Sequence, residues 1–226
     1  MVNIAVRQTD QGWFGVAWID DSFVATAIGA SAEEARAHVT SCIARGFETR
    51  FVTGDSDFAD AAARMLAELE SGNEDRKLFT LSRDHLSGPR FRILTAAASI
   101  PIGYVSTYGT VADAARSEAR AVGRAMATNP LYPIVPCHRV VGADFSMIGY
   151  GGSQDVAAIS AKLGRLRRET RGYPDPREIE LRSGILIVYP VEWVLETAQD
   201  ADRRRAQERR DTAEREALES MQLRLF

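Results

Sequence analysis

The stretch that most restricts how this chain can fold is residues 129–141, NPLYPIVPCHRVV. Proline occupies positions 130, 133 and 136, and each ring fixes its own φ and restricts the residue before it, so we expect a stiff loop. One of the two cysteines, Cys137, stands in this loop directly before His138, and Asn129 offers a further hydrogen-bonding group upstream. A thiol beside an acid/base side chain is a candidate nucleophile, and a stiff loop suits covalent chemistry better than a disulfide or packing role.

Composition and charge exclude several classes of protein. The 226 residues are 45% hydrophobic, enough for one or two domains of roughly 100–200 residues each. With 28 Lys+Arg against 31 Asp+Glu the net charge is −3, so any contact with DNA has to come from a local patch. Two cysteines do not make a disulfide framework, and the sequence shows neither a signal peptide nor an apolar run of the ~18 residues that cross a bilayer. A cytoplasmic protein without membrane contact is expected.

Residues 1–76 are predicted to form a small α/β domain. Its strands are expected at residues 4–6, 12–19, 22–28 and 47–53. Ser31 followed by Glu34 has the spacing of a capping box, which predicts a helix from there to about residue 45. Asp55 or Asp57 is expected to cap a second helix that ends near residue 70, and the polar residues 71–76 are typical of a linker.

Three side chains raise the question of a structural metal. His38 and Cys42 stand at i and i+4 of the first predicted helix, a spacing that can bind metal, and His85 would be a third ligand. No fourth ligand is evident in the sequence. We therefore predict no metal site, with Cys42 facing the core and its histidine neighbour exposed or half-buried.

A helix-turn-helix pattern precedes the cysteine loop. A helix from about residue 89 stops at Pro101, and two short helices are predicted at 110–116 and 118–128, with Ser117 as the cap of the second. The second helix has Ala and Gly at its centre and no Asn or Gln, so it can approach a groove closely but reads little sequence. Arg120 and Arg124 lie one turn apart, placed to contact phosphates. A small-residue helix packed in a core is the alternative at this point.

Taken together, these motifs resemble the catalytic domain of the methylated-DNA–protein-cysteine methyltransferases, the 6-O-alkylguanine-DNA alkyltransferases. The signature Pro-Cys-His-Arg-Val is present at 136–140, with Asn-Pro at 129–130 at the family's spacing. Tyr108-Gly109 and Arg120-Ala121-Val122-Gly123 open the two helices of the helix-turn-helix. The resemblance covers about residues 91–152, and it extends to the N-terminal domain only as an analogy of fold.

The resemblance implies a fold and a division of the chain. It implies an N-terminal α/β domain of RNase H-like type over residues 1–76, then a mainly α catalytic and DNA-binding domain over 77–171. The second domain would carry a winged-helix-like helix-turn-helix, and residues 172–226 would form a C-terminal extension. The resemblance also implies a monomer that needs no cofactor and binds double-stranded DNA containing alkylated guanine.

The resemblance also assigns chemical roles. Cys137 would accept the alkyl group and His138 would act as its base through a water. Asn129 would brace the turn, and Tyr108 would contact guanine and help to protonate the leaving base. Glu169 would orient the histidine.

Two further sets of residues follow from the resemblance. Arg120 would replace the extruded nucleotide while its helix lies in the minor groove, since repair must tolerate every sequence. The residues implied for DNA binding are Arg120, Ala121, Gly123, Arg124 and Ala127. The residues implied for the substrate pocket are Met126, Pro133, Arg139, Val140, Tyr150 and Gly151.

The sequence departs from the family after the cysteine. Residues 149–152, Gly-Tyr-Gly-Gly, stand where Tyr-Ser-Gly-Gly is usual, so Tyr150 takes the position whose backbone N–H serves the guanine oxygen. Lys162 and Glu169 keep the family's seven-residue spacing behind an insertion.

The sequence leaves more than one role open for two other acidic residues and one tyrosine. Glu178 and Asp155 are alternative acids for the histidine, and Asp155 is also placed to cap a helix that starts near Val156. Tyr132 is expected to narrow the pocket against large alkyl groups.

The end of the chain lies outside the resemblance. Residues 180–189 are predicted to form a β-hairpin around Ser183-Gly184, and residues 198–221 a solvated helix with i, i+4 ion pairs. The last five residues resemble the short Gln-Leu-x-Leu-Phe peptides that dock on the sliding clamp, through Gln222, Leu223, Leu225 and Phe226. Folding back onto the chain's own core is the alternative.

Alkyl transfer competes with three other functions. A non-enzymatic alkyl-damage sensor resembles this domain but lacks the cysteine. A helix-turn-helix DNA-binding regulator would carry base-reading side chains, and a Cys/His hydrolase would show an oxyanion-hole pattern. The leading prediction is DNA repair by irreversible, single-turnover transfer of an alkyl group from guanine oxygen-6 to Cys137 after nucleotide flipping.

Overall fold

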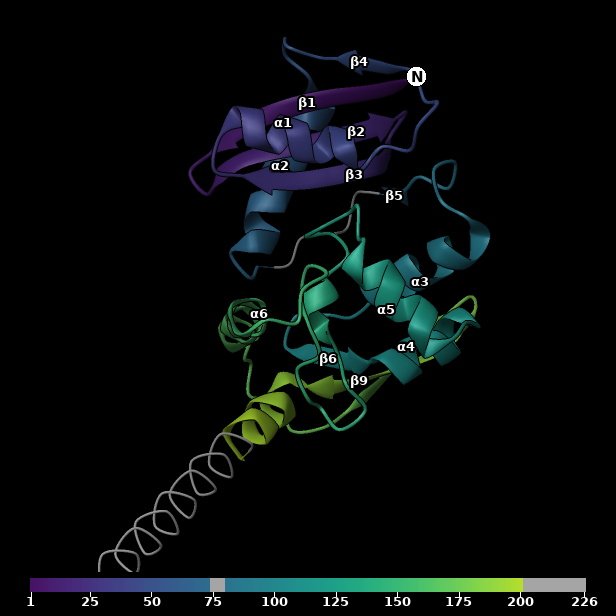
Figure 1. Cartoon of the computed structure of the whole chain (residues 1–226), viewed down its shortest axis with the longest axis vertical. Helices are drawn as coiled ribbons and strands as arrows, with labels where there is room; N and C mark the ends of the chain where they lie inside the picture. The colour runs from purple at the N-terminus through teal and green to yellow at the C-terminus, as the bar shows by residue number, and fades with distance from the viewer. Residues whose placement is uncertain (74–79, 201–226) are drawn as a thin grey trace, which may run out of the picture.

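A five-stranded sheet forms the N-terminal part of the computed structural model, which describes residues 1–73 and 80–200 (Figure 1). Its strand order is β4-β1-β2-β3-β5. The central strands β1 (Val2–Thr9), β2 (Gly12–Ile19) and β3 (Ser22–Gly29) are antiparallel, as their short turns require. The short outer strands β4 (Thr49–Phe51) and β5 (Thr80–Leu81) pair in parallel with β1 and β3.

Two helices cover opposite faces of this sheet. Because side chains alternate along a strand, Ile4 and Ala17 pack with Val39 of α1 (Ala32–Ser41), whereas Phe14 and Leu66 share a cluster on the side of α2 (Asp57–Glu70). Both faces of the central strands are therefore buried, which accounts for their nearly continuous apolar sequence.

The predicted cap of α1 is confirmed, but its predicted end is wrong. Ser31 Oγ accepts a hydrogen bond from the Glu34 N–H at 3.2 Å, and the Glu34 carboxylate accepts one from the Ala30 N–H at 2.8 Å. The helix ends at Ser41 rather than near residue 45 because residues 40–42, which follow Val39, are all exposed, and packing supplies most helix stability.

Two other local predictions in this part need correction. The cap of α2 is Ser56, whose side chain accepts from the Ala59 N–H, and neither Asp55 nor Asp57 caps it. The fourth strand is shorter than predicted, because only residues 49–51 pair in register with β1, and a single backbone hydrogen bond at Glu48 and at Val52 ends the pairing on either side.

The second part is mostly helical and carries a small sheet. Its order in the chain is α3 (Gly88–Ala98), β6 (Tyr104–Thr107), α4 (Tyr108–Ala115), α5 (Ala119–Ala127), the 3-10 turn η1 (Cys137–Arg139), β7 (Val140–Val141), α6 (Val156–Arg168), β8 (Arg177–Leu181) and β9 (Gly184–Pro190). Residues 191–200 are helical. The predicted hairpin is confirmed as β8–β9, and it extends β6 and β7 into a sheet of order β7-β6-β9-β8.

The helix-turn-helix consists of α4 and α5. Helix α4 begins at Tyr108, two residues before the predicted start, because the Thr107 side chain caps it by accepting from the Thr110 N–H. Ser117 does not cap α5. Its N–H closes the end of α4 by donating to the Ala112 carbonyl, and Glu118 takes the cap position without a side-chain hydrogen bond.

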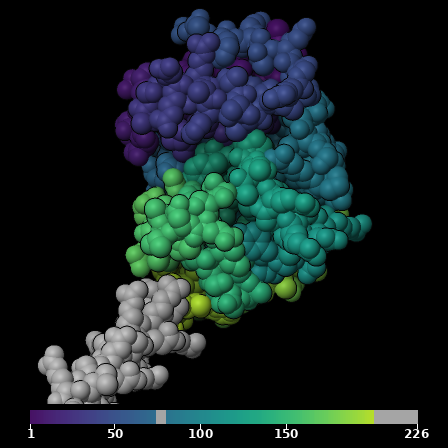
Figure 2. Space-filling view, viewed as in Figure 1, coloured from purple at the N-terminus to yellow at the C-terminus, as the bar shows by residue number. Residues whose placement is uncertain are grey.

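One apolar core runs through both parts. The cluster that contains Phe14 and Leu66 also contains Leu94 of α3 and Val122 of α5. In the space-filling view the N-terminal residues rest directly on the teal and green residues that follow (Figure 2). Among the described residues no helix combines the length and apolar character needed to span a membrane. The predicted charged helix at 198–221 lies almost wholly outside the described residues.

Candidate active site

The N-terminal sheet and an asparagine hold the cysteine loop from two sides. On β3, the Thr26 N–H donates to the Pro130 carbonyl at 2.9 Å and Thr26 Oγ1 donates to the Tyr132 carbonyl at 2.7 Å. Asn129 Nδ2 donates to the Val135 carbonyl at 2.7 Å, while Asn129 Oδ1 accepts from the Leu131 N–H at 3.0 Å. These bonds tie together the two ends of the proline-rich segment directly before Cys137.

Cys137 opens the 3-10 turn and is 8% exposed. Burial raises the pKa of its thiol above the ordinary value, while the Asn129 side chain and the positive charges of Lys162 and Arg165 act in the opposite direction. The thiol is therefore protonated at neutral pH, with groups around it that stabilise the anion once the proton is removed.

His138 and Glu169 form a buried hydrogen bond. His138 Nε2 lies 2.8 Å from Glu169 Oε1, and the two residues are 4% and 3% exposed. A carboxylate only accepts, so Nε2 carries the imidazole proton and Nδ1 is left with its lone pair. Nδ1 is buried and has no partner among the described residues. Burial lowers the pKa of His138, although Glu169 opposes this, so the ring is neutral at pH 7 and Nδ1 is free to accept a proton.

Arg139 completes this buried group from the other side of Glu169. Its Nε donates to Glu169 Oε2 at 2.7 Å, one Nη donates to Oε1 at 3.0 Å, and the other donates to the Ile100 carbonyl at 2.8 Å. Burial alone raises the pKa of Glu169, but the hydrogen bonds and charges of His138 and Arg139 outweigh it and lower that pKa to about 2. The acid is therefore ionised at every pH at which the protein would work.

The backbone around the cysteine is fastened to α6 by Lys162. Its Nζ donates to the Val140 carbonyl at 2.6 Å and to the Gly149 carbonyl at 3.3 Å, and the residue is 1% exposed. Burial lowers the pKa of Lys162 to about 8, with the neighbouring Cys137 acting against this. The lysine thus holds β7, the strand that follows Cys137, and the glycine-rich loop at a fixed separation.

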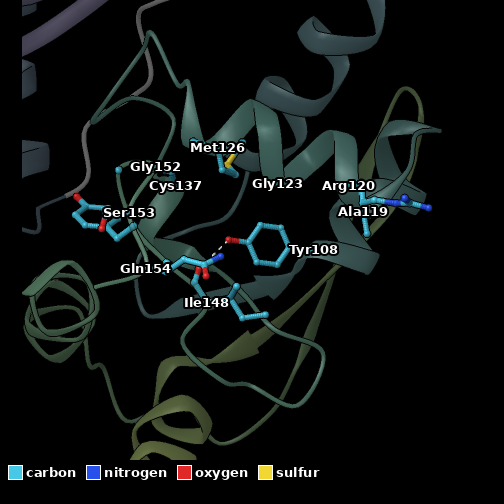
Figure 3. A pocket seen from close by; sticks show the side chains of 14 residues that line it. Tyr108, Ala119, Arg120, Gly123, Met126, Cys137, Ile148, Gly152, Ser153 and Gln154 are labelled. Atoms are coloured by element: carbon cyan, nitrogen blue, oxygen red, sulfur yellow. Dashed lines mark hydrogen bonds between the residues drawn. The ribbon is translucent and has the colours of Figure 1, made fainter. Parts of the chain in front are cut away.

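A cavity of about 380 Å³ opens onto Cys137 (Figure 3). It lies between the helix-turn-helix and the loop before α6, and Tyr108 donates from its Oη to the Ile148 carbonyl at 3.2 Å across it. Figure 3 shows Arg120 at one end, with its guanidinium directed away from the cysteine. The lining residues are Tyr108, Ala119, Arg120, Gly123, Met126, Ala127, Cys137, Ile148, Gly149, Tyr150, Gly151, Gly152, Ser153 and Gln154.

Half of the residues predicted for the substrate pocket do not line it. Met126, Tyr150 and Gly151 do. Pro133 and Val140 are buried and do not line the cavity, and the Arg139 side chain is engaged in its bonds with Glu169. Side chains on consecutive residues of a tight turn diverge, so proximity to Cys137 in sequence did not place them in the cavity.

Tyr132 does not narrow this cavity as predicted. Its Oη donates to Glu70 Oε2 at 2.8 Å, and Glu70 also pairs with Arg165 of α6. Tyr132 also interacts electrostatically with Tyr150, a lining residue whose pKa is raised to about 12 chiefly by burial. Glu70 of α2 thus joins the N-terminal part to Tyr132 and to Arg165 through polar contacts that no sequence motif signalled.

The alternative acids lie elsewhere. Asp155 caps α6 by accepting from the Ala158 N–H at 2.7 Å, and Glu178 is exposed on β8. Ile148, Ser153 and Gln154 line the cavity but were not predicted, since the departure from the family pattern at residues 149–152 left no motif to place this loop.

The residues predicted for DNA binding all lie on α5, where Ala121 also packs against the core. Arg120, Arg124 and Ala127 are exposed, and Ala121 and Gly123 are partly exposed. A Cβ added at Gly123 would meet no atom within 4 Å, so nothing in the protein obstructs the exposed face of the helix. A smooth helix face flanked by arginines fits close approach to a nucleic-acid backbone.

The three residues considered for a metal do not converge. The His85 ring lies against Phe47 with centroids 3.8 Å apart, whereas His38 and Cys42 are exposed. The predicted core-facing orientation of Cys42 is therefore wrong. Within residues 1–73 and 80–200 no group of three or more His, Cys, Asp or Glu is arranged to hold a metal ion.

Comparison with known proteins gives the site its context. Residues 90–171 match the family model described as 6-O-methylguanine DNA methyltransferase, DNA binding domain. A methylated-DNA–protein-cysteine methyltransferase of Mycobacterium leprae is 48% identical over 71 residues, which are 30% of this chain and 43% of that protein. The sequence match thus spans less than half the length of this curated relative.

Solved structures extend the match beyond this segment. The O6-methylguanine methyltransferase of Mycobacterium tuberculosis superposes with a TM-score of 0.51 at 27% identity, over 77% of this chain and 96% of that one. A structure of Mycobacterium tuberculosis OGT in complex with DNA superposes with a TM-score of 0.53 at 25% identity, over 74% and 92%. The likeness therefore includes the N-terminal sheet as well as the helical part.

Proposed function

Because residues 90–171 belong to the methylated-DNA–protein-cysteine methyltransferase family, we propose that this chain repairs DNA by transferring a methyl or other alkyl group from guanine oxygen-6 to Cys137. The observation that carries the proposal is a buried thiol that opens onto a cavity and is followed by a neutral histidine whose Nε2 is fixed on a carboxylate. An alkyl carbon is attacked well by a soft thiolate, and a thiolate needs a base when the thiol pKa is raised.

The proposed reaction is one displacement at carbon. The Cys137 thiol gives its proton to His138 Nδ1, through a water as the resemblance to the family implies, and Glu169 stabilises the resulting imidazolium. The sulfur then forms a bond to the alkyl carbon while the carbon–oxygen bond breaks, and its electron pair passes to guanine oxygen-6. Tyr108 donates a proton or a hydrogen bond to the leaving base. Burial raises the pKa of Tyr108, so its hydroxyl carries a proton at neutral pH. The thioether product is not hydrolysed, and each molecule acts once.

The fold supports separate roles for α5 and for the N-terminal sheet in the repair of DNA. We propose that the outer face of α5 lies in the minor groove and that Arg120 fills the space of a nucleotide rotated into the cavity, because the target oxygen is out of reach in a stacked duplex. The N-terminal sheet, which we propose to be RNase H-like, holds the cysteine loop. The boundaries near residues 76 and 171 and a monomeric state belong to the same proposal.

Label transfer tests the proposed function directly. A duplex that carries radiolabelled O6-methylguanine should pass its label to the protein in a one-to-one ratio, and Cys137→Ser should remove the transfer. Cys42→Ser is the matched control, since Cys42 is exposed and distant in sequence from the cavity, and it should retain full transfer. Label that remains on the DNA after incubation with the wild type would refute the proposal.

Arg120→Ala separates flipping from chemistry. We expect it to slow transfer from a duplex by roughly 10-fold or more, the equivalent of about 1.4 kcal/mol of unstacking that the arginine no longer offsets. Transfer from the free methylated base should be nearly unchanged, because no stack has to be opened. Equal losses on both substrates would contradict a flipping role.

We further propose, from sequence alone, that Gln222, Leu223, Leu225 and Phe226 dock on a sliding clamp. These residues lie outside the described residues, and the support is the resemblance of their pattern to clamp-binding peptides. A chain that ends at residue 221 should lose capture by an immobilised clamp and keep alkyl transfer on short duplexes. Capture that is unchanged by the truncation would remove this proposal.

A further inference from the structure

The β8–β9 hairpin lies outside the residues that match the family model, yet it rests against the turn of the helix-turn-helix. The Arg116 Nε donates to the Ser183 carbonyl at the hairpin tip at 2.9 Å. A Cβ added at Gly184 would stand 3.4 Å from the Ala114 carbonyl oxygen, so the two backbones are in close approach there. Strand β9 is also hydrogen-bonded to β6, which leads into α4. The hairpin is therefore fixed at both its base and its tip.

A cleft with four arginines lies where the hairpin meets the helices. It measures about 900 Å³, and its arginines come from four places in the chain: Arg83 before α3, Arg92 on α3, Arg116 at the turn and Arg182 at the hairpin tip. Glu180 is the single acidic residue among those that line it. Arg83, Arg116 and Arg182 are exposed, so three of the four can meet a ligand without rearrangement of the core.

Two of the cleft arginines, Arg92 and Arg116, are held through Nε and keep their Nη donors free within the part of the chain that the structure describes. Arg92 uses Nε on the Ala115 carbonyl at 3.0 Å, and Arg116 uses Nε on Ser183. The Arg83 guanidinium lies 4.8 Å from the centroid of the Phe91 ring. For Arg92 and Arg116 the Nη groups donate to no acceptor among the described residues. Guanidinium groups fixed through Nε, with free Nη donors, match phosphate oxygens in charge and geometry.

The cleft continues the face that we assign to DNA. It borders the turn between α4 and α5, and Arg120 lies in the first turn of α5. In Figure 3 the yellow-green hairpin turn rises beside the end of the cavity at which Ala119 and Arg120 lie. The nearby exposed acids, Asp113 and Glu118, do not line the cleft. In a chain with a net charge of −3, this grouping of arginines is the kind of local patch that a polyanion requires.

We propose that the hairpin is a wing that binds duplex DNA, and that the cleft takes backbone phosphates beside the damaged nucleotide through Arg83, Arg116 and Arg182. This inference rests on the proposed repair function and adds a second contact to it. The contact is with the backbone, so it raises affinity for any sequence and leaves the chemistry at Cys137 untouched.

The test is the salt dependence of DNA binding by the full chain. In a Cys137→Ser background, which removes transfer, affinity for a methylguanine duplex is measured over a range of salt concentrations. Each lost phosphate contact lowers the slope of log K against log salt by about 0.9, so we expect that change and roughly three- to tenfold weaker binding for Arg182→Ala. Arg83→Ala should behave alike, and the double variant should lose about twice as much slope.

A control on the same hairpin distinguishes a contact from a general loss of charge. The Arg177 guanidinium lies over the Tyr104 and Tyr173 rings, at 5.1 and 5.2 Å from their centroids, and it does not line the cleft. Arg177→Ala should therefore leave the slope unchanged. The proposal that the hairpin binds DNA would be overturned by an unchanged salt slope for Arg182→Ala and Arg83→Ala. It would also be overturned if Arg177→Ala lowered the slope by the same amount.

A second readout separates this inference from the proposed function. With Cys137 intact, transfer from the free methylated base should be the same for Arg182→Ala and for the wild type, whereas transfer from dilute duplex should slow in proportion to the lost affinity. If the wild type transfers nothing from either substrate, the proposed function fails. If it transfers normally and the Arg182 variant does so equally well on dilute duplex, only the wing fails.

Discussion

Replacing His138 with glutamine is expected to slow alkyl transfer about 10²- to 10⁴-fold at neutral pH, the range for loss of a general base. The reason is the raised pKa of the buried Cys137 thiol, which leaves little thiolate unless a base takes the proton. Glutamine keeps much of the volume and offers a donor to Glu169, so the buried carboxylate is not left without a partner. Single-turnover transfer from a methylguanine duplex measures the effect.

The pH profile identifies the histidine as a base. As pH rises toward the pKa of the thiol, Cys137 ionises unaided and the deficit of His138→Gln should shrink. Ultraviolet absorbance of the thiolate should follow the same curve. A deficit that stays constant at all pH values would mean that the histidine acts by packing alone.

Arg139→Ala is expected to lower the free energy of unfolding by about 3–5 kcal/mol, the cost of breaking a buried ion pair by removing one partner. Arg139 makes two of the three side-chain hydrogen bonds to Glu169, and both residues are at most 3% exposed. Urea unfolding at neutral pH measures the loss. Arg167→Ala is the matched control, because Arg167 is exposed on α6 and its replacement should change stability little.

The same group predicts loss of stability in acid. The pKa of Glu169 is about 2 in the folded chain against an ordinary 4.5, so the unfolded chain binds more protons as pH falls. Its contribution, about 3 kcal/mol, is complete above about pH 4.5 and is lost as pH falls toward 2. Arg139→Ala should flatten this dependence, since the carboxyl pKa then lies nearer its ordinary value. An equally steep dependence in the variant would contradict the assignment.

Local chemistry made much of this site predictable. Cys137 and His138 are neighbours in sequence, and Ser31 and Asp155 cap their helices through residues three positions on, so short patterns were enough. Glu169 lies 31 residues from His138, and only the family's spacing from Lys162 pointed to it.

The features of the site that could not be predicted from the sequence depend on contacts between segments far apart in the chain. The direction of the Arg139 side chain follows from the 3-10 turn and the position of α6. Tyr132 turns toward Glu70, 62 residues away, and β9 joins β6 over an even longer separation. Each of these contacts depends on how the elements pack in three dimensions. The hydrophobic periodicity within one element does not predict that packing.

The two hydrogen bonds between Thr26 and the cysteine loop have a consequence for the rate of the proposed transfer. A mobile nucleophile must lose conformational freedom before it can align with the bond that breaks. The entropy lost in that step adds to the activation free energy of the reaction. The two hydrogen bonds from β3 restrict the loop while the protein folds, so the loss is incurred before the damaged base arrives. The N-terminal sheet would thereby increase the rate of the proposed alkyl transfer by holding the loop that carries Cys137.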